Sequence, residues 1–434
     1  MSGPGTITVP VPPASGWRRA VAHLGGREQR LILGGSLIML AGSVTVAVLN
    51  FAFNVVVART LGPANFGHIS AAVTLLMLAS AITLSFQLVG AKFIARNGSG
   101  AGKLAVFRSL QQRAWLAGIA IGGGLALASP WLAAALRMPS PWLLVLMGVA
   151  IAVYVPVGVR RGYFHGECQF PRLAGNFVVE AAVRLLAALI LVLVGWGVFG
   201  AVGAIVLSVM AAYLLPPVRL PSNTGAGELI PPSMLEGTQA IAFFVGKVII
   251  NNIDVLLVKH FFPPAEAGIY AAVALVGRVL AIMSWQVVSA MFPVSAANTK
   301  DDRRVLIYPM LMVLGLTAAF ILGALAFSTQ VIGGIFGTSF AAGIGLMPIY
   351  AATAGAYTLA VVLMTYEMSR KVASASWIQL AFSALVVLAI ALFHASLKQV
   401  IAVQLALMLA MIVAVSIPFL RGSVPAQASE EVPA

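Results

Sequence analysis

The chain has 434 residues, of which 61% are hydrophobic and only 9% are charged. Its mean hydropathy of +1.01 excludes an ordinary soluble enzyme or binding domain and indicates a polytopic membrane protein. The net charge of +14 could also suit nucleic-acid binding. The basic residues, however, lie in short segments beside apolar runs, so no nucleic-acid partner is expected.

Taken in chain order, residues 1–30 change from Pro- and Gly-rich to basic, which predicts a cytoplasmic N-terminal tail rather than a cleaved signal. Apolar runs follow, each near the roughly 20 residues that a helix needs to cross the hydrocarbon core. Twelve transmembrane helices of an all-α protein are predicted, at 31–58, 66–91, 114–136, 142–159, 173–195, 198–218, 238–258, 268–294, 305–327, 343–366, 372–393 and 398–419. Residues 421–434 are small and polar and predict a C-terminal tail.

The lysines and arginines between these runs set the predicted orientation. Most of the 26, including the pair Arg160–Arg161, fall in segments on the side of the N-terminus. The opposite side holds only Arg59, Arg137, Lys259 and Lys398. Because cytoplasmic loops of membrane proteins are enriched in Lys and Arg, both termini are predicted to lie in the cytoplasm.

The chain also repeats itself at an offset of 201 residues, residues 50–72 matching residues 251–273. The identical pairs are Asn50 and Asn251, Val57 and Val258, Pro63 and Pro264, Ala64 and Ala265, Gly67 and Gly268, and Ala71 and Ala272. Chance similarity between Ala- and Val-rich helices is the alternative, but the helix–Pro–Gly–helix corner matches as well. We therefore predict two parallel-repeat six-helix bundles, 31–220 and 235–420, joined by a cytoplasmic linker at 221–234, around a central cleft.

A few polar residues interrupt the apolar runs, and a charge at the bilayer centre costs at least ~2.5–3.5 kcal/mol. Lys247, Asn251 and Asp254 are spaced i, i+4 and i+7, so a continuous helix would carry them on one face. The others are Asn50 and Asn54 in the first run, Glu180 and Arg184 in the fifth, and Arg278 in the eighth. We predict that all of them line one central space with a net positive charge.

Structural roles are open for several of these residues. Glu180 and Arg184, four residues apart, could form a purely structural ion pair, and Asp254 could pair with Lys247 or Arg278. Arg59, at the outer end of the first run, could either extend into lipid headgroups or bind an anionic substrate.

The corner sequences resemble a known family. Residues 59–67 read RTLGPANFG, similar to the R-x-L-G-P-x-x-F-G signature of polysaccharide exporters. Asp254 with Val258, followed by Gly268 and Tyr270, is similar to their second motif, D-x-x-x-V … G-x-Y. The chain thus resembles the lipid-linked oligosaccharide flippases of the multidrug/oligosaccharidyl-lipid/polysaccharide exporter superfamily. That family often has fourteen helices, two more than predicted here.

The resemblance implies a substrate and a place in the cell. The substrate would be an oligosaccharide on a polyprenyl diphosphate, moved from the inner to the outer leaflet of a bacterial cell membrane by alternating access. The product would serve exopolysaccharide or cell-surface glycan synthesis, with membrane lipids, glycosyltransferases and a polysaccharide polymerase as partners. The cations Arg59, Arg184, Lys247 and Arg278 suit the diphosphate, and Asn50, Asn54 and Asn251 suit sugar hydroxyls. Asp254 and Glu180 would balance charge or couple transport.

Two other functions compete with the flippase. A cation-coupled multidrug exporter of the same superfamily should concentrate carboxylates in its cavity, whereas the first half supplies only Glu180, next to its own arginine. A membrane polysaccharide polymerase or ligase usually places its catalytic residues on a sizeable outer loop, and the predicted outer loops here are too short. In addition, no cluster of His, Asp and Glu predicts an acid–base or metal site. We therefore expect a protein that is not an enzyme and needs no cofactor.

Overall fold

The structure, a computed structural model, describes residues 26–218, 230–231, 238–297, 304–369 and 374–420, and these residues contain no strand. The predicted linker and most of both predicted tails therefore lie outside the described residues. The first helices are α2 (Gly26–Arg96), α3 (Gly100–Leu127), α4 (Ser129–Ala135), α5 (Trp142–Gly166), α6 (Phe170–Leu193) and α7 (Gly197–Leu214). We call this group the N-terminal half.

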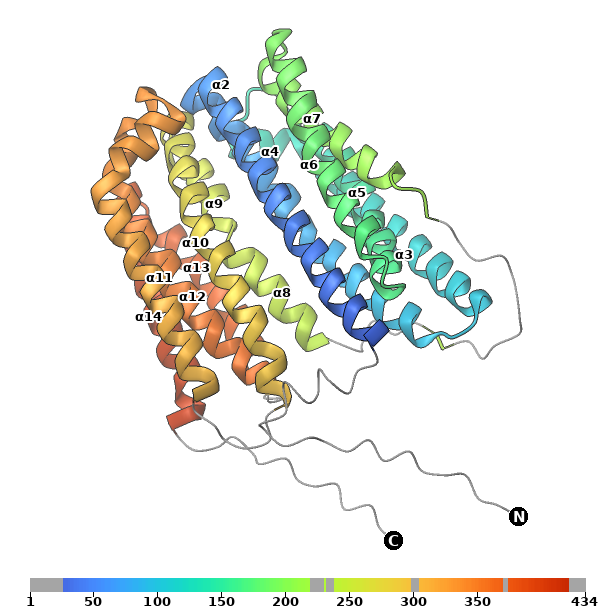
Figure 1. The fold of residues 1–434 in the computed structure, drawn as a ribbon. Coiled ribbons are helices and arrows are strands. Elements are labelled where there is room, and N and C mark those ends of the chain that lie inside the picture. Colours follow the sequence, from blue (N-terminus) through green and yellow to red (C-terminus); the bar gives the residue numbers. More distant parts are fainter. Residues whose placement is uncertain (1–25, 219–229, 232–237, 298–303, 370–373, 421–434) are drawn as a thin grey trace, which may run out of the picture.

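The remaining elements are α8 (Thr238–Ile250), α9 (Ile253–Phe261), α10 (Pro264–Ala297), α11 (Arg304–Thr329), the π-helical turn η1 (Gln330–Phe336), the 3-10 segment η2 (Thr338–Leu346), α12 (Met347–Ser369), α13 (Ser374–Leu392) and α14 (Leu397–Leu420). We call this group the C-terminal half. Figure 1 shows the two halves side by side, with the long α2 next to the helices of the C-terminal half.

The helices account for the predicted spans. Among the described residues, eight helices are long and apolar enough to cross a membrane, or nine if the bent pair α3–α4 forms one span. Three further spans appear once α2 is divided at its kink, α8 is joined to α9, and the shorter apolar helix α13 is included. The twelve predicted runs thus correspond in order to helices of an all-α membrane protein.

The corner predicted between the first two runs is a sharp bend within α2. Gly62 has φ 74° and ψ 175°, a backbone conformation that is strained for any residue with a side chain, and Pro63 begins the next helical arm. The bend lies at the end of the molecule opposite the start of α2 and the end of α14 (Figure 1). We call this end, which also holds the α9–α10 turn, the corner end.

Gly62→Ala is expected to lower the thermal stability of the purified protein, because the Cβ atom is strained at this φ even though no other atom lies within 4 Å of its position. Gly123→Ala in α3 is the matched control, since its Cβ also meets nothing within 4 Å but the backbone there is helical. Thermal unfolding monitored by fluorescence compares the two. Equal melting temperatures for both variants would contradict the assigned backbone conformation.

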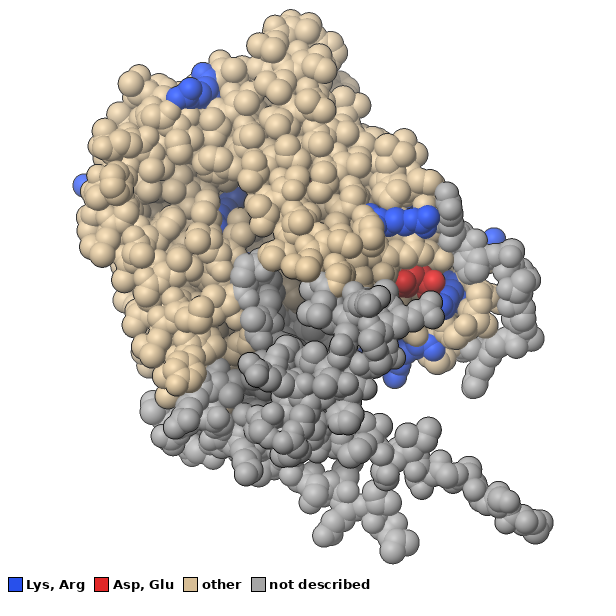
Figure 2. Space-filling model, in the orientation of Figure 1, with Lys and Arg blue, Asp and Glu red and all other residues tan. Residues whose placement is uncertain are grey.

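The outer surface of the helices is apolar. Large side chains such as Leu127, Leu193 and Trp131 are more than 70% exposed. Figure 2 shows a broad face on which the described residues carry few charges. Soluble proteins rarely expose continuous apolar surfaces of this extent, whereas a lipid bilayer requires them. The surface therefore supports a multi-pass membrane protein independently of hydropathy.

Candidate substrate site

The N-terminal half contains a buried ion cluster on α5 and α6. Glu180 accepts a hydrogen bond at Oε2 from Arg161 at 2.6 Å, and at Oε1 from Arg184. All three side chains are more than 90% buried. The predicted Glu180–Arg184 pair is thus present, but it belongs to a triad with two cations and one anion.

Polar neighbours hold this triad in place. Arg161 Nε donates to Asn176 Oδ1 at 2.7 Å, and Asn176 donates in turn to the carbonyl oxygen of Ala212 at 2.6 Å. Arg184 Nη1 donates to Asn50 Oδ1 at 3.0 Å, which connects the triad to α2. Such complete satisfaction is what a buried charge cluster needs to be stable, so the triad has the features of a structural element.

Arg161 is a buried cation of this triad that sequence reasoning missed. It was placed in a cytoplasmic segment, but α5 continues to Gly166 and leaves Arg161 only 1% exposed. The aromatic residues Tyr163 and Phe164, which follow after Gly162, were a signal that the helix continues. Lys259, which the sequence predicts on the outer side, lies in the last turn of α9 and is fully buried there.

In the C-terminal half, the predicted continuous helix 238–258 is wrong. α8 ends at Ile250 and α9 begins at Ile253, so Lys247 and Asp254 lie on different helices and share no face. Asn251 and Asn252 occupy the break, and their side-chain amides donate to the carbonyl oxygens of Lys247 and Val248, both at 2.7 Å. The break is stable within an apolar protein because these amides satisfy carbonyl groups near the end of α8.

Asp254 has tyrosines as its partners. Its Oδ2 accepts hydrogen bonds from Tyr270 at 2.9 Å and from Tyr350 at 3.0 Å, and Gln404 donates to the Tyr270 hydroxyl at 2.9 Å. The carboxylate is 1% exposed, and its Oδ1 has no hydrogen-bond partner among the described residues. The cations that the sequence suggested for it, Lys247 and Arg278, are not its hydrogen-bond partners.

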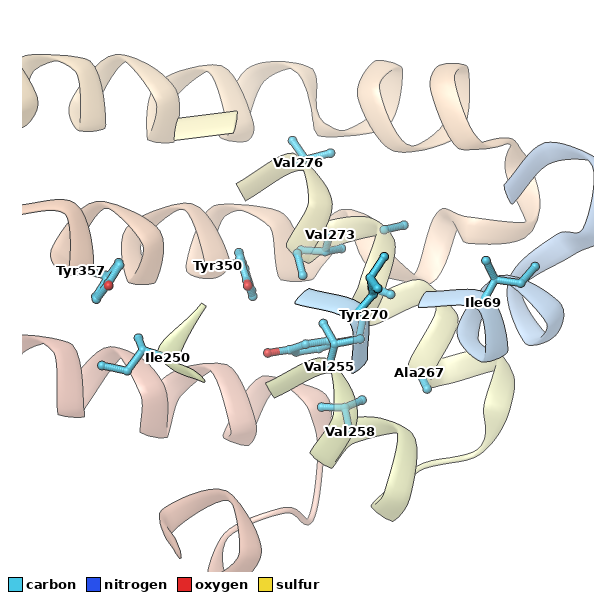
Figure 3. Close-up of a cluster of buried hydrophobic side chains, with 14 of the residues drawn as sticks. Ile69, Ile250, Val255, Val258, Ala267, Tyr270, Val273, Val276, Tyr350 and Tyr357 are labelled. Carbon is cyan, nitrogen blue, oxygen red and sulfur yellow. The ribbon is translucent and has the colours of Figure 1, made fainter. Parts of the chain in front are cut away.

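A pocket next to Asp254 encloses about 410 Å³ of empty space, part of it open at the mouth. Its walls come from the α8–α9 break and from α10, α12 and α14, and they include Ile250, Asn251, Gly277, Arg278, Ala281, Tyr350, Thr353, Ala354, Tyr357, Gln404 and Met408. Figure 3 shows the hydroxyl groups of Tyr270, Tyr350 and Tyr357 directed into the space between these helices. The pocket therefore combines a cation with hydroxyl and amide groups.

Arg278 differs from the other buried arginines. Its Nε and Nη2 atoms are buried and have no hydrogen-bond partner among the described residues, whereas Arg161 and Arg184 donate to Glu180. Leaving buried donors without partners costs free energy, and a guanidinium group is a donor that binds anions well.

The predicted site residues thus divide into groups. Asn50, Glu180 and Arg184 form one cluster in the N-terminal half, with Asn54 donating to the Asn50 carbonyl at 2.7 Å. Asn251, Asp254 and Arg278 lie at or next to the pocket of the C-terminal half, and Lys247 is half-buried one turn before the α8–α9 break. Arg59 joins neither group, because it lies at the corner end and hydrogen-bonds to η1.

Comparison with protein families identifies one match, to the family described as "Polysaccharide biosynthesis protein", over residues 32–299. No curated protein matches. Among solved structures, the chain is similar to the inward-facing conformation of a multidrug resistance MATE family transporter of the MOP superfamily, with a TM-score of 0.68, 16% identity, and coverage of 92% of this chain and 99% of that chain.

The outward-facing conformation of a multidrug resistance MATE family transporter is similar with a TM-score of 0.60 and 15% identity, over 91% of this chain and 94% of that chain. A MOP superfamily transporter from Pyrococcus furiosus, reported with a binding pocket of reverse polarity that suggests a different function, has a TM-score of 0.61 and 15% identity over the same shares. At these identities the likeness establishes the fold, with nearly full-length coverage on both sides.

Proposed function

Because the chain belongs to the polysaccharide biosynthesis protein family and has the fold of MOP superfamily transporters, we propose that it is a flippase for polyprenyl-diphosphate-linked oligosaccharides. The observation that carries this proposal is the Arg278 pocket, which tyrosine, threonine and amide side chains also line, and in which two buried guanidinium nitrogens of Arg278 have no hydrogen-bond partner among the described residues. A diphosphate or acidic sugar complements the cation, and sugar hydroxyls complement the neutral donors and acceptors.

The physical steps of transport follow from this arrangement. The polyprenyl tail stays in lipid beside the apolar outer surface, while the polar head passes through the protein by alternating access. A headgroup of charge −2 moving outward across 100 mV, inside negative, gains roughly 4–5 kcal/mol. The membrane potential can therefore supply much of the driving force for an anionic substrate.

The cellular setting is part of the same proposal. We propose that both termini lie in the cytoplasm of a bacterium, and the start of α2 and the end of α14 at one end of the molecule support this (Figure 1). The lipid-linked glycan is supplied by glycosyltransferases at the inner leaflet and used by a polysaccharide polymerase at the outer leaflet. The product is an exopolysaccharide or a cell-surface glycan.

The test is transport by the purified full-length protein in liposomes. A fluorescent polyprenyl-diphosphate oligosaccharide is quenched from outside, and the protein is expected to speed its exchange between leaflets relative to empty liposomes and to a matched polyprenyl-phosphate lacking sugar. Transport of lipophilic cationic dyes without exchange of the lipid-linked glycan would refute the flippase and support a multidrug exporter.

The multidrug exporter is retained as the second candidate because of Asp254. Its buried Oδ1 has no hydrogen-bond partner among the described residues, and such a carboxylate could bind a proton or a cation that drives transport. Glu180 in the N-terminal half is not equivalent, since both of its oxygens are engaged by arginines.

Asp254→Asn is expected to fold normally and to slow flipping several-fold. The amide oxygen still accepts hydrogen bonds from Tyr270 and Tyr350, but the loss of the negative charge leaves Arg278 freer to hold the anionic head, which delays its release. Initial rates and binding affinity, measured in the same liposomes, should show slower turnover with tighter binding. Normal turnover at normal expression would contradict this role, and poor expression alone would favour a static structural role for Asp254.

A further inference from the structure

The two repeats meet directly at the corner end, through a pair of equivalent glycines. A Cβ atom added to Gly67 would lie 2.5 Å from the carbonyl oxygen of Pro264, and one added to Gly268 would overlap the carbonyl oxygen of Pro63. Because the obstructing atoms are backbone, they cannot move aside as a flexible side chain would. The two corners therefore cross at a distance that only glycine permits at both positions.

Two side chains, Arg59 and His260, connect the halves by hydrogen bonds near this crossing. Arg59 Nε donates to the carbonyl oxygen of Ile335 at 2.8 Å, and Nη2 of the same side chain donates to the carbonyl oxygen of Gly334. His260 Nδ1 lies 2.7 Å from the carbonyl oxygen of Ala135, and since a carbonyl can only accept, this nitrogen carries the proton. Each bond links the corner of one half to the other half.

The repeat relates these two contacts. At the offset of 201 residues, Arg59 corresponds to His260, and the segment α4 (Ser129–Ala135) corresponds to η1 (Gln330–Phe336). Arg59 in α2 thus contacts carbonyl groups of η1 in the C-terminal half, and His260 in α9 contacts a carbonyl group of the equivalent segment α4 in the N-terminal half. Both contacts require the two halves to be packed together, and neither half could form them alone.

Apolar packing completes the contact on one side. Phe66 on α2 lies 6.4 Å from Phe336 and 5.9 Å from Phe340, measured between ring centroids. Phe51 lies 6.4 Å from Phe336 with the rings edge to face. These rings pack without hydrogen bonds or charge, so they can separate and repack without leaving a buried polar group unsatisfied.

We infer that the corner end is the gate of the protein: the Arg59 and His260 contacts form a pair of clasps that hold it closed, and the crossing of Gly67 and Gly268 sets the closed geometry. Because the acceptors are backbone carbonyls, release of the clasps leaves no buried anion unpaired, and the Arg59 cation is already exposed. This inference concerns how the halves meet and does not depend on the substrate that is carried.

The test measures the distance between two spin labels by pulsed electron resonance, with the full-length protein in lipid nanodiscs. Ala64→Cys and Ala265→Cys carry the labels, because they are exposed, repeat-related and next to the crossing, and the exposed Cys168 is first replaced by Ser. The starting protein should give mostly one short distance. Gly67→Ala and Gly268→Ala should shift the distribution to longer distances, whereas Gly315→Ala, whose Cβ meets nothing within 4 Å, should leave it unchanged.

The clasps are tested separately with substitutions that keep side-chain bulk. Arg59→Met should raise the open-to-closed ratio about tenfold or more, because a charged donor loses two hydrogen bonds, and His260→Phe should raise it only a few-fold. Lys398→Met removes an exposed cation from the same end and should have no effect.

Unchanged distances in the Arg59→Met/His260→Phe double variant would overturn the inference, and so would an effect of Lys398→Met as large as that of Arg59→Met. If the glycine variants do not yield monodisperse protein, the double variant decides. Because no substrate is present, an absence of glycan flipping leaves this result intact.

Discussion

Arg161→Met is expected to destabilise the protein by about 3–5 kcal/mol, the usual cost of removing one partner from a buried charge cluster. The change removes the donor to Glu180 Oε2 and the donor to Asn176 Oδ1, and leaves both acceptors more than 90% buried. Unfolding in mixed micelles at increasing denaturant measures the loss. Arg108→Met, an exposed arginine on α3, is the control and should unfold like the unmodified protein.

A variant in which the whole triad is apolar sharpens this prediction. Arg161→Met, Glu180→Leu and Arg184→Met together leave no buried charge, so much of the lost stability should return. If the single and triple variants were equally unstable, packing volume rather than charge pairing would explain the effect. A fully stable Arg161→Met variant would show that the triad contributes nothing to folding.

Arg278→Met is expected to reduce flipping about 10- to 100-fold without loss of folding, in contrast to Arg161→Met. Two of its guanidinium nitrogens have no hydrogen-bond partner among the described residues, so few native contacts are lost. What is lost is the charge-assisted binding of the anionic head, worth about 1.5–3 kcal/mol per hydrogen bond. The measurement is the initial rate of leaflet exchange in liposomes, with the melting temperature recorded for the same preparation.

Arg278→Lys is the matched variant, since it keeps the charge but loses the forked geometry that fits two phosphate oxygens. It should retain part of the activity. Full activity in Arg278→Met at normal protein level would remove this pocket from the transport path. Arg184→Met provides the opposite pattern, because Arg184 is committed to Glu180 and Asn50 and its loss should reduce stability along with transport.

The fold was largely predictable because the length of each apolar run and the Gly–Pro corner determine structure over short stretches of the chain. Gly62 followed directly by Pro63 favours a sharp bend, and the apolar runs leave few alternatives to membrane helices. The α8–α9 break was not predictable in the same way. Asn251 and Asn252 fit a helical pattern, and only their bonds to carbonyl oxygens of α8 reveal that they sit in an interruption.

The site was predictable in part. The i, i+4 spacing identified the Glu180–Arg184 pair, but the predicted span ended at residue 159 and so left Arg161 in a cytoplasmic segment, whereas α5 continues to Gly166. Charge counting also treated Arg184 and Arg278 alike. The difference between them, one engaged and one with unpaired donors, depends on which helices pack together, and this is not encoded in local spacing.

The internal repeat has a further consequence for how the two halves have diverged. In the 201-residue register, Phe53 occupies the position of Asp254 and Ile69 that of Tyr270, and both are buried in the apolar core. If the halves descend from a duplicated ancestor, the polar centre of the second half has no counterpart at these positions in the first. The two halves thus share the helix–corner–helix arrangement but differ in the polar residues that they carry.

Gly67 and Gly268, in contrast, are identical in the two halves, and each is in contact with the other corner. A side chain added at one position would clash with the backbone of the other corner. Neither glycine can therefore be replaced unless the other corner moves as well. Contact between the two corners thus restricts both positions to glycine, a restriction that does not apply to residues packed within one half. In a homodimeric ancestor the two glycines would be the same residue in two copies of one chain, so a single mutation would introduce the clash on both sides at once.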